Sequence, residues 1–190
     1  MLYQNKYRLE FTRLRNWDYG SPGLYLITIC TKNKIPFFGE ILNGGMECAD
    51  EEMYVGVETQ NFASLQTKLQ PTKIGIIARQ YWNDIPCHFP FVQLDEFILM
   101  PDHMHGILKF NKPGYAKWDR NTFGPQSQNL ASVIRGYKAG VKRYATQNNI
   151  PFAWQSRYYD QIIGTTPELI AARYYIKNNP IKWLTNRSST

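Results

Sequence analysis

Two apolar segments separated by only two residues constrain the fold more than any other feature of this chain. The first, FVQLDEFILM, spans residues 91–100, and the second, HMHGILKF, spans residues 103–110. Both are rich in apolar residues that favour strands, and Pro101 and Asp102 between them are typical of turns. Because this connection is too short for a helical crossover, the two segments are predicted to pair as an antiparallel hairpin.

The remaining segments predict strands interleaved with helices. The predicted elements are a buried strand at residues 23–31, strand fragments and loop at residues 43–72, a helix from near Thr72 to Pro86, a helix at about residues 127–147, an extended segment at residues 153–164 and a last helix from Thr166 to Asn179. With 190 residues the chain fits a single domain, residues 1–190. We expect an α+β domain with an antiparallel sheet and helices packed on one face.

The composition excludes several classes of protein. Hydrophobic residues make up 43% and charged residues 19% of the chain, and no apolar run of about 18 residues occurs, which argues against a membrane span and against general disorder. The start, MLYQNKYRLEFTRLRNW, lacks an apolar signal-peptide core, so a cytoplasmic protein is expected. Cys30, Cys48 and Cys87 form no CxxC pair, which argues against a disulfide framework or a zinc knuckle.

The formal net charge of +7 comes entirely from the last third of the chain. Acidic and basic residues balance up to residue 126, whereas nine basic residues face two acidic ones from Ser127 onward. Such an excess, together with 15% aromatic residues, fits a polyanion such as nucleic acid, although a solvated basic face would have the same pattern. The candidate DNA-binding residues are Arg135, Lys138, Lys142, Arg143, Arg157, Arg173 and Lys177.

Two of the three histidines are separated by one residue on the second predicted strand. The side-chain period of two in a strand directs His103 and His105 to the same face, where two imidazoles can bind one divalent metal. Two half-buried histidines on a sheet would show the same spacing. His88 stands alone and is expected to be a loop residue.

The last predicted helix carries a second pair of candidates. At about 100° per residue, Tyr175 and Asn179 lie on the same side of the buried stripe, whereas Tyr174 points almost opposite to it. Tyr175 could act as a nucleophile and Asn179 as an oxygen ligand. A tyrosine at the edge of the core beside a polar helix end would have the same pattern.

These motifs together resemble a known family. The string FILMPDHMHGILKF is similar to the His-hydrophobe-His strand of the single-tyrosine HUH transposases. With WQSRYYDQII, ARYYIKNNPIKW and the opening WDYGSPGLYLITICTKNKIPFFGE, the chain resembles specifically the REP-associated tyrosine transposases, over most of its length. Only residues from about 44 to 70 are unmatched.

The resemblance implies a ferredoxin-like HUH endonuclease domain that nicks and joins single-stranded DNA, often beside a hairpin. By this resemblance His103, His105 and Asn179 hold a divalent metal, Mg or Mn, and Tyr175 attacks the scissile phosphate. The expected product is a 5′-phosphotyrosine with a free 3′-hydroxyl, which allows strands to be rejoined during DNA transposition. No membrane partner is expected, and the sequence does not decide between a monomer and a homodimer.

Alternatives remain at this stage. The family has His and Arg where this chain has Gln161 and Gly164, which keeps open a non-catalytic hairpin DNA or RNA binder on the same fold. An HUH replication or mobilisation nickase would share the chemistry, but its chains usually carry further domains. A metal-dependent phosphodiesterase that uses water is disfavoured, because no carboxylate-rich cluster accompanies the His pair.

Overall fold

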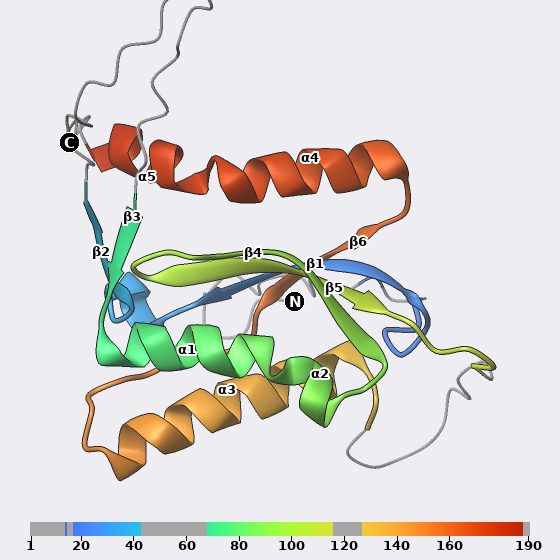
Figure 1. The fold of residues 1–190 in the computed structure, drawn as a ribbon, viewed down its shortest axis with the longest axis horizontal. Coiled ribbons are helices and arrows are strands. Elements are labelled where there is room, and N and C mark those ends of the chain that lie inside the picture. Colours follow the sequence, from blue (N-terminus) through green and yellow to red (C-terminus); the bar gives the residue numbers. More distant parts are fainter. Residues whose placement is uncertain (1–13, 15–16, 43–67, 116–126, 188–190) are drawn as a thin grey trace, which may run out of the picture.

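The central element of the fold is a four-stranded antiparallel sheet with strand order β4-β5-β1-β6 (Figure 1). The computed structural model describes residues 14, 17–42, 68–115 and 127–187. The strands are β1 (Gly23–Cys30), β4 (Val92–Leu99), β5 (His103–Phe110) and β6 (Tyr159–Ile163). With helices between β1 and β4 and between β5 and β6, the chain follows the β-α-β-β-α-β order of ferredoxin-like domains. The predicted α+β class is thereby confirmed.

Strands β4 and β5 form the predicted hairpin. They pair from Val92 opposite Phe110 to Leu99 opposite Met104, with a bulge between Leu94 and Phe97. The turn closes through a hydrogen bond of 2.8 Å that the Met100 N–H donates to the His103 carbonyl. The short Pro-Asp connection therefore directs the chain as expected.

Two helices pack together on one face of the sheet, as predicted, and a third helix covers the other face, which the sequence did not predict. Helices α1 (Lys73–Asn83) and α3 (Leu130–Gln147) lie on one side, and α4 (Thr166–Lys177) lies on the other (Figure 1). The reason is the composition of β5, on which Met104 and Leu108 belong to the core under α1 and α3 while Ile107 belongs to a smaller core with Ile176 of α4. A strand that is apolar on both faces needs a layer on each.

The core between the sheet and α1 is closely packed at one glycine. Trp82 of α1 stacks on Phe97 of β4 with ring centroids 5.1 Å apart and meets Tyr137 of α3 edge-on at 5.6 Å. Gly106 of β5 lies directly beneath it, and a Cβ atom there would stand only 2.3 Å from Cζ2 of Trp82. The absence of a side chain at Gly106 lets the indole lie flat on the strand.

Local signals explain where the helices begin. Helix α3 starts with a capping box between Asn129 and Ser132, and α4 with one between Thr165 and Glu168. Helix α1 ends at Asn83, earlier than the predicted Pro86, which instead lies in the first turn of the short helix α2 (Ile85–His88). A proline is tolerated there because the first turn has no intrahelical acceptor for its missing N–H.

The last predicted helix ends within two residues of the predicted Asn179, but the sequence did not predict the helix that follows it. Helix α4 ends at Lys177, and a further helix, α5 (Asn179–Arg187), begins immediately after Asn178. Pro180 again occupies a first turn, where it is compatible with a helix. The break between the two helices lies at Asn178, and α5 follows α4 along the same side of the sheet (Figure 1).

Smaller elements complete the described chain. A single 3-10 turn, η1 (Lys32–Lys34), follows β1, and β2 (Gly39–Leu42) pairs with β3 (Lys68–Pro71) as a separate ribbon. The strand fragments predicted within residues 43–72 lie outside the described residues except for β3, and Cys48 lies outside them as well. Among the described residues no helix has the length and apolar character needed to cross a bilayer.

Candidate functional site

The two histidines of β5 face the α4 side of the sheet. Their ring centroids are 4.8 Å apart with an interplanar angle of 74°. His105 is 4% exposed, and it lies opposite Thr28 of β1 in the sheet register. The strand period therefore places both imidazoles side by side, as the sequence predicted.

Each imidazole is held through its Nδ1 atom. Nδ1 of His103 lies 2.5 Å from Oδ1 of the buried Asp102, and Nδ1 of His105 lies 2.8 Å from Oγ1 of Thr28. The Asp102 carbonyl accepts hydrogen bonds from the N–H and hydroxyl of the buried Thr31, which fixes the turn against β1. These contacts orient both rings and leave both Nε2 atoms directed at one site, as the outer partners of metal-binding histidines do.

The buried histidine is uncharged at neutral pH. Burial, and secondarily the neighbouring His103, lowers the pKa of His105 from its usual value of 6.5 to about 3. An uncharged imidazole has a lone pair available for a metal or a hydrogen-bond donor. The environment of His105 therefore favours the protonation state that a ligand role requires.

Helices α4 and α5 bring the other two candidates to the same Nε2 atoms. The Tyr175 hydroxyl lies 3.4 Å from Nε2 of His105, and Oδ1 of Asn179 lies 3.3 Å from Nε2 of His103. Tyr175 comes from the last turn of α4, whereas Asn179 is the first residue of α5. The helix break thus allows both side chains to face the sheet from consecutive turns.

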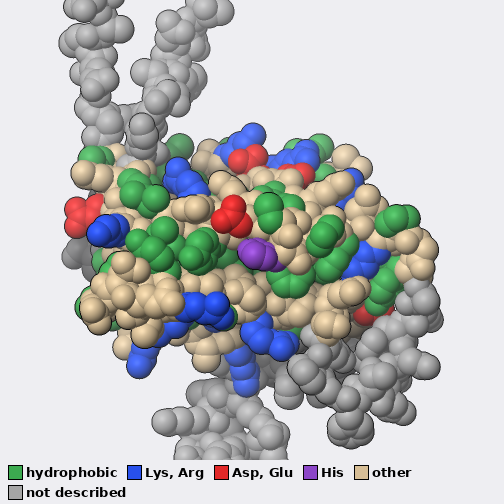
Figure 2. All heavy atoms as spheres, turned by 60° about the horizontal axis from the view of Figure 1, so that its bottom comes forward, with side chains coloured by type: hydrophobic (Ala, Val, Ile, Leu, Met, Phe, Trp, Pro, Cys, Tyr) green, Lys and Arg blue, Asp and Glu red, His purple; other side chains and the backbone are tan. Residues whose placement is uncertain are grey.

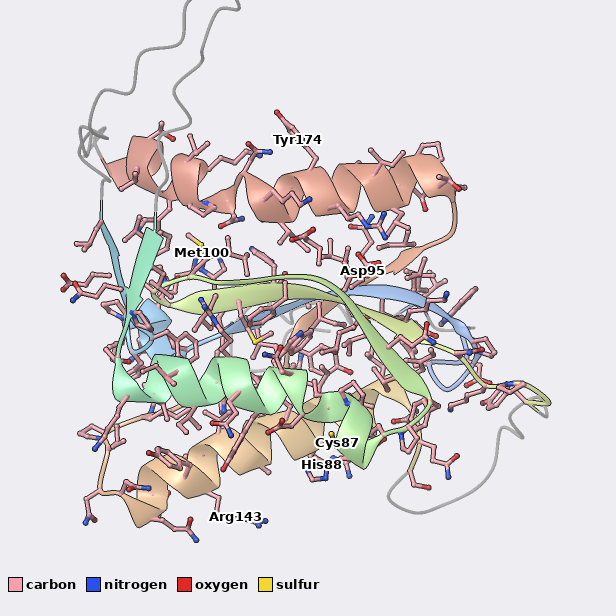
Figure 3. The ribbon with its side chains drawn as sticks, viewed as in Figure 1. Cys87, His88, Asp95, Met100, Arg143 and Tyr174 are labelled. Atoms are coloured by element: carbon pink, nitrogen blue, oxygen red, sulfur yellow. The ribbon has the colours of Figure 1, made fainter. Side chains whose placement is uncertain are left out.

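The adjacent tyrosine has a different environment. Tyr174 is 69% exposed and points away from the sheet (Figure 3), whereas Tyr175 is 38% exposed and its ring lies 5.0 Å from that of His105. His88, at the end of α2, is exposed on the opposite side of the sheet. Of the two adjacent tyrosines, only Tyr175 faces the histidine pair.

An open cavity of about 550 Å³ surrounds this cluster. It is lined by the four candidate residues and by others from β1, η1, the segment before β6, β6 itself and α5, among them Lys34, Lys182, Trp183, Tyr159 and Cys30. Burial raises the pKa of the Cys30 thiol, so the residue is a neutral thiol and a poor nucleophile at pH 7. The phenols of Tyr159 and Tyr175 also line the cavity, and the Tyr175 hydroxyl is the one that lies beside Nε2 of His105.

Sequence reasoning missed two cations at this cavity, Lys34 and Lys182. Lys182 was detectable in principle, since it follows Asn179 by three residues and helical neighbours at that spacing share a face. That inference required helix α5, which was not predicted because the sequence pattern places the end of the last helix before Pro180. Lys34 follows a strand in an irregular turn, and no periodic signal marks it.

The structure gives the predicted basic residues different environments. Arg173 makes a two-fold ion pair with Asp95, with distances of 2.8 and 2.6 Å, and Lys177 lies 3.3 Å from Glu96. The ammonium groups of Lys138 and Lys142 donate to backbone carbonyls of the segment between α3 and β6. The three remaining candidates are exposed, namely Arg135, Arg143 and Arg157. Arg143 points away from α3 (Figure 3).

The basic side chains do not gather into one patch. Figure 2, in which the α1 and α3 side comes forward, shows Lys and Arg side chains spread over this face among hydrophobic, polar and some acidic groups. Arg135 lies beside Tyr158 at a second, smaller hollow of about 430 Å³ on α3. The charge excess of the C-terminal third is therefore distributed over both sides of the sheet.

The donor set at the cavity fits a divalent metal only if the amide of Asn179 is counted. Within the described ranges, no three His, Cys, Asp or Glu side chains form a metal-binding group. Two imidazole nitrogens and one amide oxygen are nevertheless suitable neutral ligands, and they leave coordination positions open for a phosphate oxygen. The chemistry of these donors is compatible with Mn or Mg.

Comparison with known proteins assigns the fold. The sheet order and the two helical layers are those of the ferredoxin-like HUH fold, and the structure superposes on that of a REP-associated tyrosine transposase bound to a REP hairpin with a TM-score of 0.52. The two chains are 14% identical, and the match covers 90% of this chain and 74% of the transposase. At this identity the likeness defines the class of fold.

A closer relative defines the family. The chain is 37% identical over 180 residues to an uncharacterized protein of Haemophilus influenzae strain Rd, a match that covers 90% of this chain and 87% of the relative. The chain belongs to the same family as this protein. No protein-family model matches it.

Proposed function

We propose that this protein nicks and rejoins single-stranded DNA in a metal-dependent, transposase-like reaction through a phosphotyrosine at Tyr175. The observation that carries the proposal is the convergence of Tyr175, His105, His103 and Asn179, from three elements, on one cavity. The likeness of the fold to a transposase that was solved with a hairpin supports a hairpin-forming sequence as the target.

His103, His105 and Asn179 are the residues that would hold the metal. When bound, a divalent Mn or Mg ion supplies a Lewis acid that polarises the scissile phosphate and neutralises developing charge. Asp102 and Thr28 keep the two imidazoles in position from behind. This preorganisation reduces the ordering required when DNA binds.

Tyr175 is the proposed nucleophile. Its phenol oxygen forms a bond to phosphorus as the bond from phosphorus to the 3′ oxygen breaks, so the phenol loses a proton and the released 3′-hydroxyl gains one. The phosphotyrosine keeps the phosphodiester energy, and attack by a 3′-hydroxyl regenerates Tyr175 and joins a strand. Neither direction requires a nucleotide cofactor.

The DNA outside the cavity is proposed to contact the exposed basic residues of α3 and the following segment. Arg135, Arg143 and Arg157 are exposed, make no ion pair within the described part of the chain, and remain available for phosphates. Arg173 and Lys177 are less suited to that role, because Asp95 and Glu96 already neutralise them.

The decisive experiment is a search for the covalent adduct. The protein is incubated with a labelled single-stranded oligonucleotide that carries a hairpin, in Mn or Mg, and the products are separated on a denaturing gel. Wild type and Tyr174→Phe should form a protein–DNA band, and Tyr175→Phe should not, because it lacks the attacking oxygen. Mass spectrometry should locate the DNA on Tyr175.

Two outcomes would contradict the proposal. An adduct on Tyr174, or undiminished cleavage by Tyr175→Phe, would overturn the site assignment. DNA binding with no adduct in either metal would favour the alternative, a non-catalytic hairpin DNA or RNA binder.

The two positions at which the chain departs from the transposase pattern, Gln161 and Gly164, do not line the cavity.

A further inference from the structure

Helix α5 places three chemically different side chains at the cavity. The cavity is lined by Asn179, Lys182 and Trp183 of this helix. Lys182 and Trp183 follow Asn179 by three and four positions, a spacing that puts all three side chains on one helical face. The ammonium of Lys182 lies 5.2 Å from the centre of the Tyr175 ring. Helix α5 therefore supplies a positive charge directly beside the proposed nucleophile.

A second cation reaches the cavity from the 3-10 turn after β1. Lys34 lines it together with Cys30, which lies opposite His103 in the β1–β5 register. Asn33 and Lys34 both adopt left-handed backbone conformations, with φ of 55° and 53°. Such residues are strained, persist where the surrounding structure imposes the conformation, and concentrate at functional positions.

The electrostatic balance of the cavity is one-sided. Among the described residues that line the cavity, Lys34 and Lys182 are basic, and none is an aspartate or glutamate. Neither lysine takes part in an ion pair in the described part of the chain, in contrast to Arg173 and Lys177 on the same side of the sheet. Two uncompensated ammonium groups in a hollow raise the local concentration of an anion.

We propose that Lys34 and Lys182 bind consecutive backbone phosphates of the single strand in this cavity. Lys182 contacts the phosphate that Tyr175 attacks, and Lys34 contacts a neighbouring phosphate at the His103 end. Lysine ammonium groups are common phosphate ligands that act as point charges, so the contacts are independent of base sequence. The proposal rests on the proposed function for the identity of the anion.

The test measures DNA binding without cleavage. A fluorescein-labelled oligo(dT) of ten nucleotides is titrated in EDTA at several salt concentrations, and anisotropy reports the dissociation constant. Lys182→Gln and Lys34→Gln should each weaken binding about tenfold, the loss expected for one charge-assisted contact. Each should also reduce the slope of log affinity against log salt by about 0.7, the value for one phosphate of a single strand.

Matched controls separate the cavity from the general charge. Lys32→Gln removes an exposed lysine from the same turn as Lys34, and Lys177→Gln removes one from α4 that is already paired with Glu96. Both should bind like wild type, and Lys182→Arg should restore affinity. Equal losses in the controls, or unchanged affinity and salt slope in Lys182→Gln and Lys34→Gln, would overturn the proposal.

The same variants distinguish this proposal from the proposed function. If Lys182→Gln and Lys34→Gln bind oligo(dT) and form the covalent adduct as wild type does, the proposed phosphate contacts are refuted and the proposed nicking activity is retained. If the two variants lose affinity and wild type forms no adduct in Mn or Mg, the contacts stand while the nuclease is wrong. Thermal unfolding of each variant confirms that these exposed substitutions leave the fold intact.

Discussion

The amide oxygen of Asn179 lies 3.3 Å from Nε2 of His103, although the two residues are 76 positions apart in the chain. The contact joins the first turn of α5 to the start of β5, and it is matched by the approach of the Tyr175 hydroxyl to His105. Because the two contacts come from consecutive helical turns, the position of α4 on the sheet controls both.

The first prediction concerns the proposed metal ligands. His105→Ala and Asn179→Ala should lower the affinity for Mn, the histidine variant by more, because an imidazole is the stronger ligand for this metal and Asn179 supplies a neutral oxygen. We expect at least a tenfold loss for His105→Ala, measured by calorimetric titration. Metal affinity equal to that of wild type in His105→Ala would remove the metal site.

Asn179→Asp provides the matched variant, because it keeps the oxygen donor and adds a negative charge. It should bind Mn more tightly than wild type if Asn179 is a ligand. Weaker binding by Asn179→Asp would place the metal elsewhere.

The second prediction concerns the ion pair that holds α4 to β4. The hydrogen bond and charge of Arg173 lower the pKa of Asp95, a residue of β4 whose carboxylate pairs with this side chain of α4 (Figure 3). A carboxyl whose pKa is lowered on folding stabilises the fold above its unfolded pKa, about 4, and this contribution disappears as pH falls through the folded pKa. Asp95→Asn should therefore unfold at lower urea than wild type at pH 7.

The difference between Asp95→Asn and wild type should shrink as the pH is lowered toward 3. Glu96→Gln is the control, because its partner Lys177 is 65% exposed and such pairs contribute little. A difference for Asp95→Asn that is the same at pH 7 and pH 3 would contradict a role for its charge.

The third prediction concerns the glycine beneath Trp82. Gly106→Ala should lower the free energy of unfolding by about 3 kcal/mol, since the added Cβ would overlap the indole and force a shift of the sheet or of α1. Gly136→Ala on α3 is the matched control, because its Cβ would meet Phe89 at an ordinary 3.4 Å. The control should gain up to about 1 kcal/mol from helix propensity, as measured by urea unfolding. Equal stability of the two variants would contradict the packing described.

The fourth prediction separates two basic residues of α3. From the sequence, Arg135 and Lys138 are equivalent candidates for phosphate contact, but the half-buried Lys138 donates to the carbonyls of Gln155 and Arg157. Lys138→Ala should therefore lower stability by about 1–2 kcal/mol, because these carbonyls lose their partner.

Arg135→Ala should leave stability unchanged and reduce the salt dependence of hairpin binding by about one unit of slope. Measurements of urea unfolding and of binding at several salt concentrations test both variants together. A reversed pattern, with the stability loss in Arg135→Ala, would show that the two side chains exchange roles in solution.

Local patterns in the sequence determined much of the candidate site. The period of two put His103 and His105 on one face, and the helical period separated Tyr175 from Tyr174; both arrangements occur in the structure. The short Pro-Asp connection determined the hairpin. Each of these relationships depends on residues close together in the chain, where backbone geometry alone fixes which side chains are neighbours.

The tertiary structure decided the rest. Whether α4 lies on the face of the histidines depends on which layer covers β5, and a strand that is apolar on both faces does not distinguish them. Which lysines remain available for an anionic ligand depends on partners far away in sequence, such as Glu96 for Lys177 and the Gln155 carbonyl for Lys138. Net charge is a sum over residues, whereas a phosphate-binding site requires charges without partners at one cavity, and only packing brings Lys34 and Lys182 to the same one.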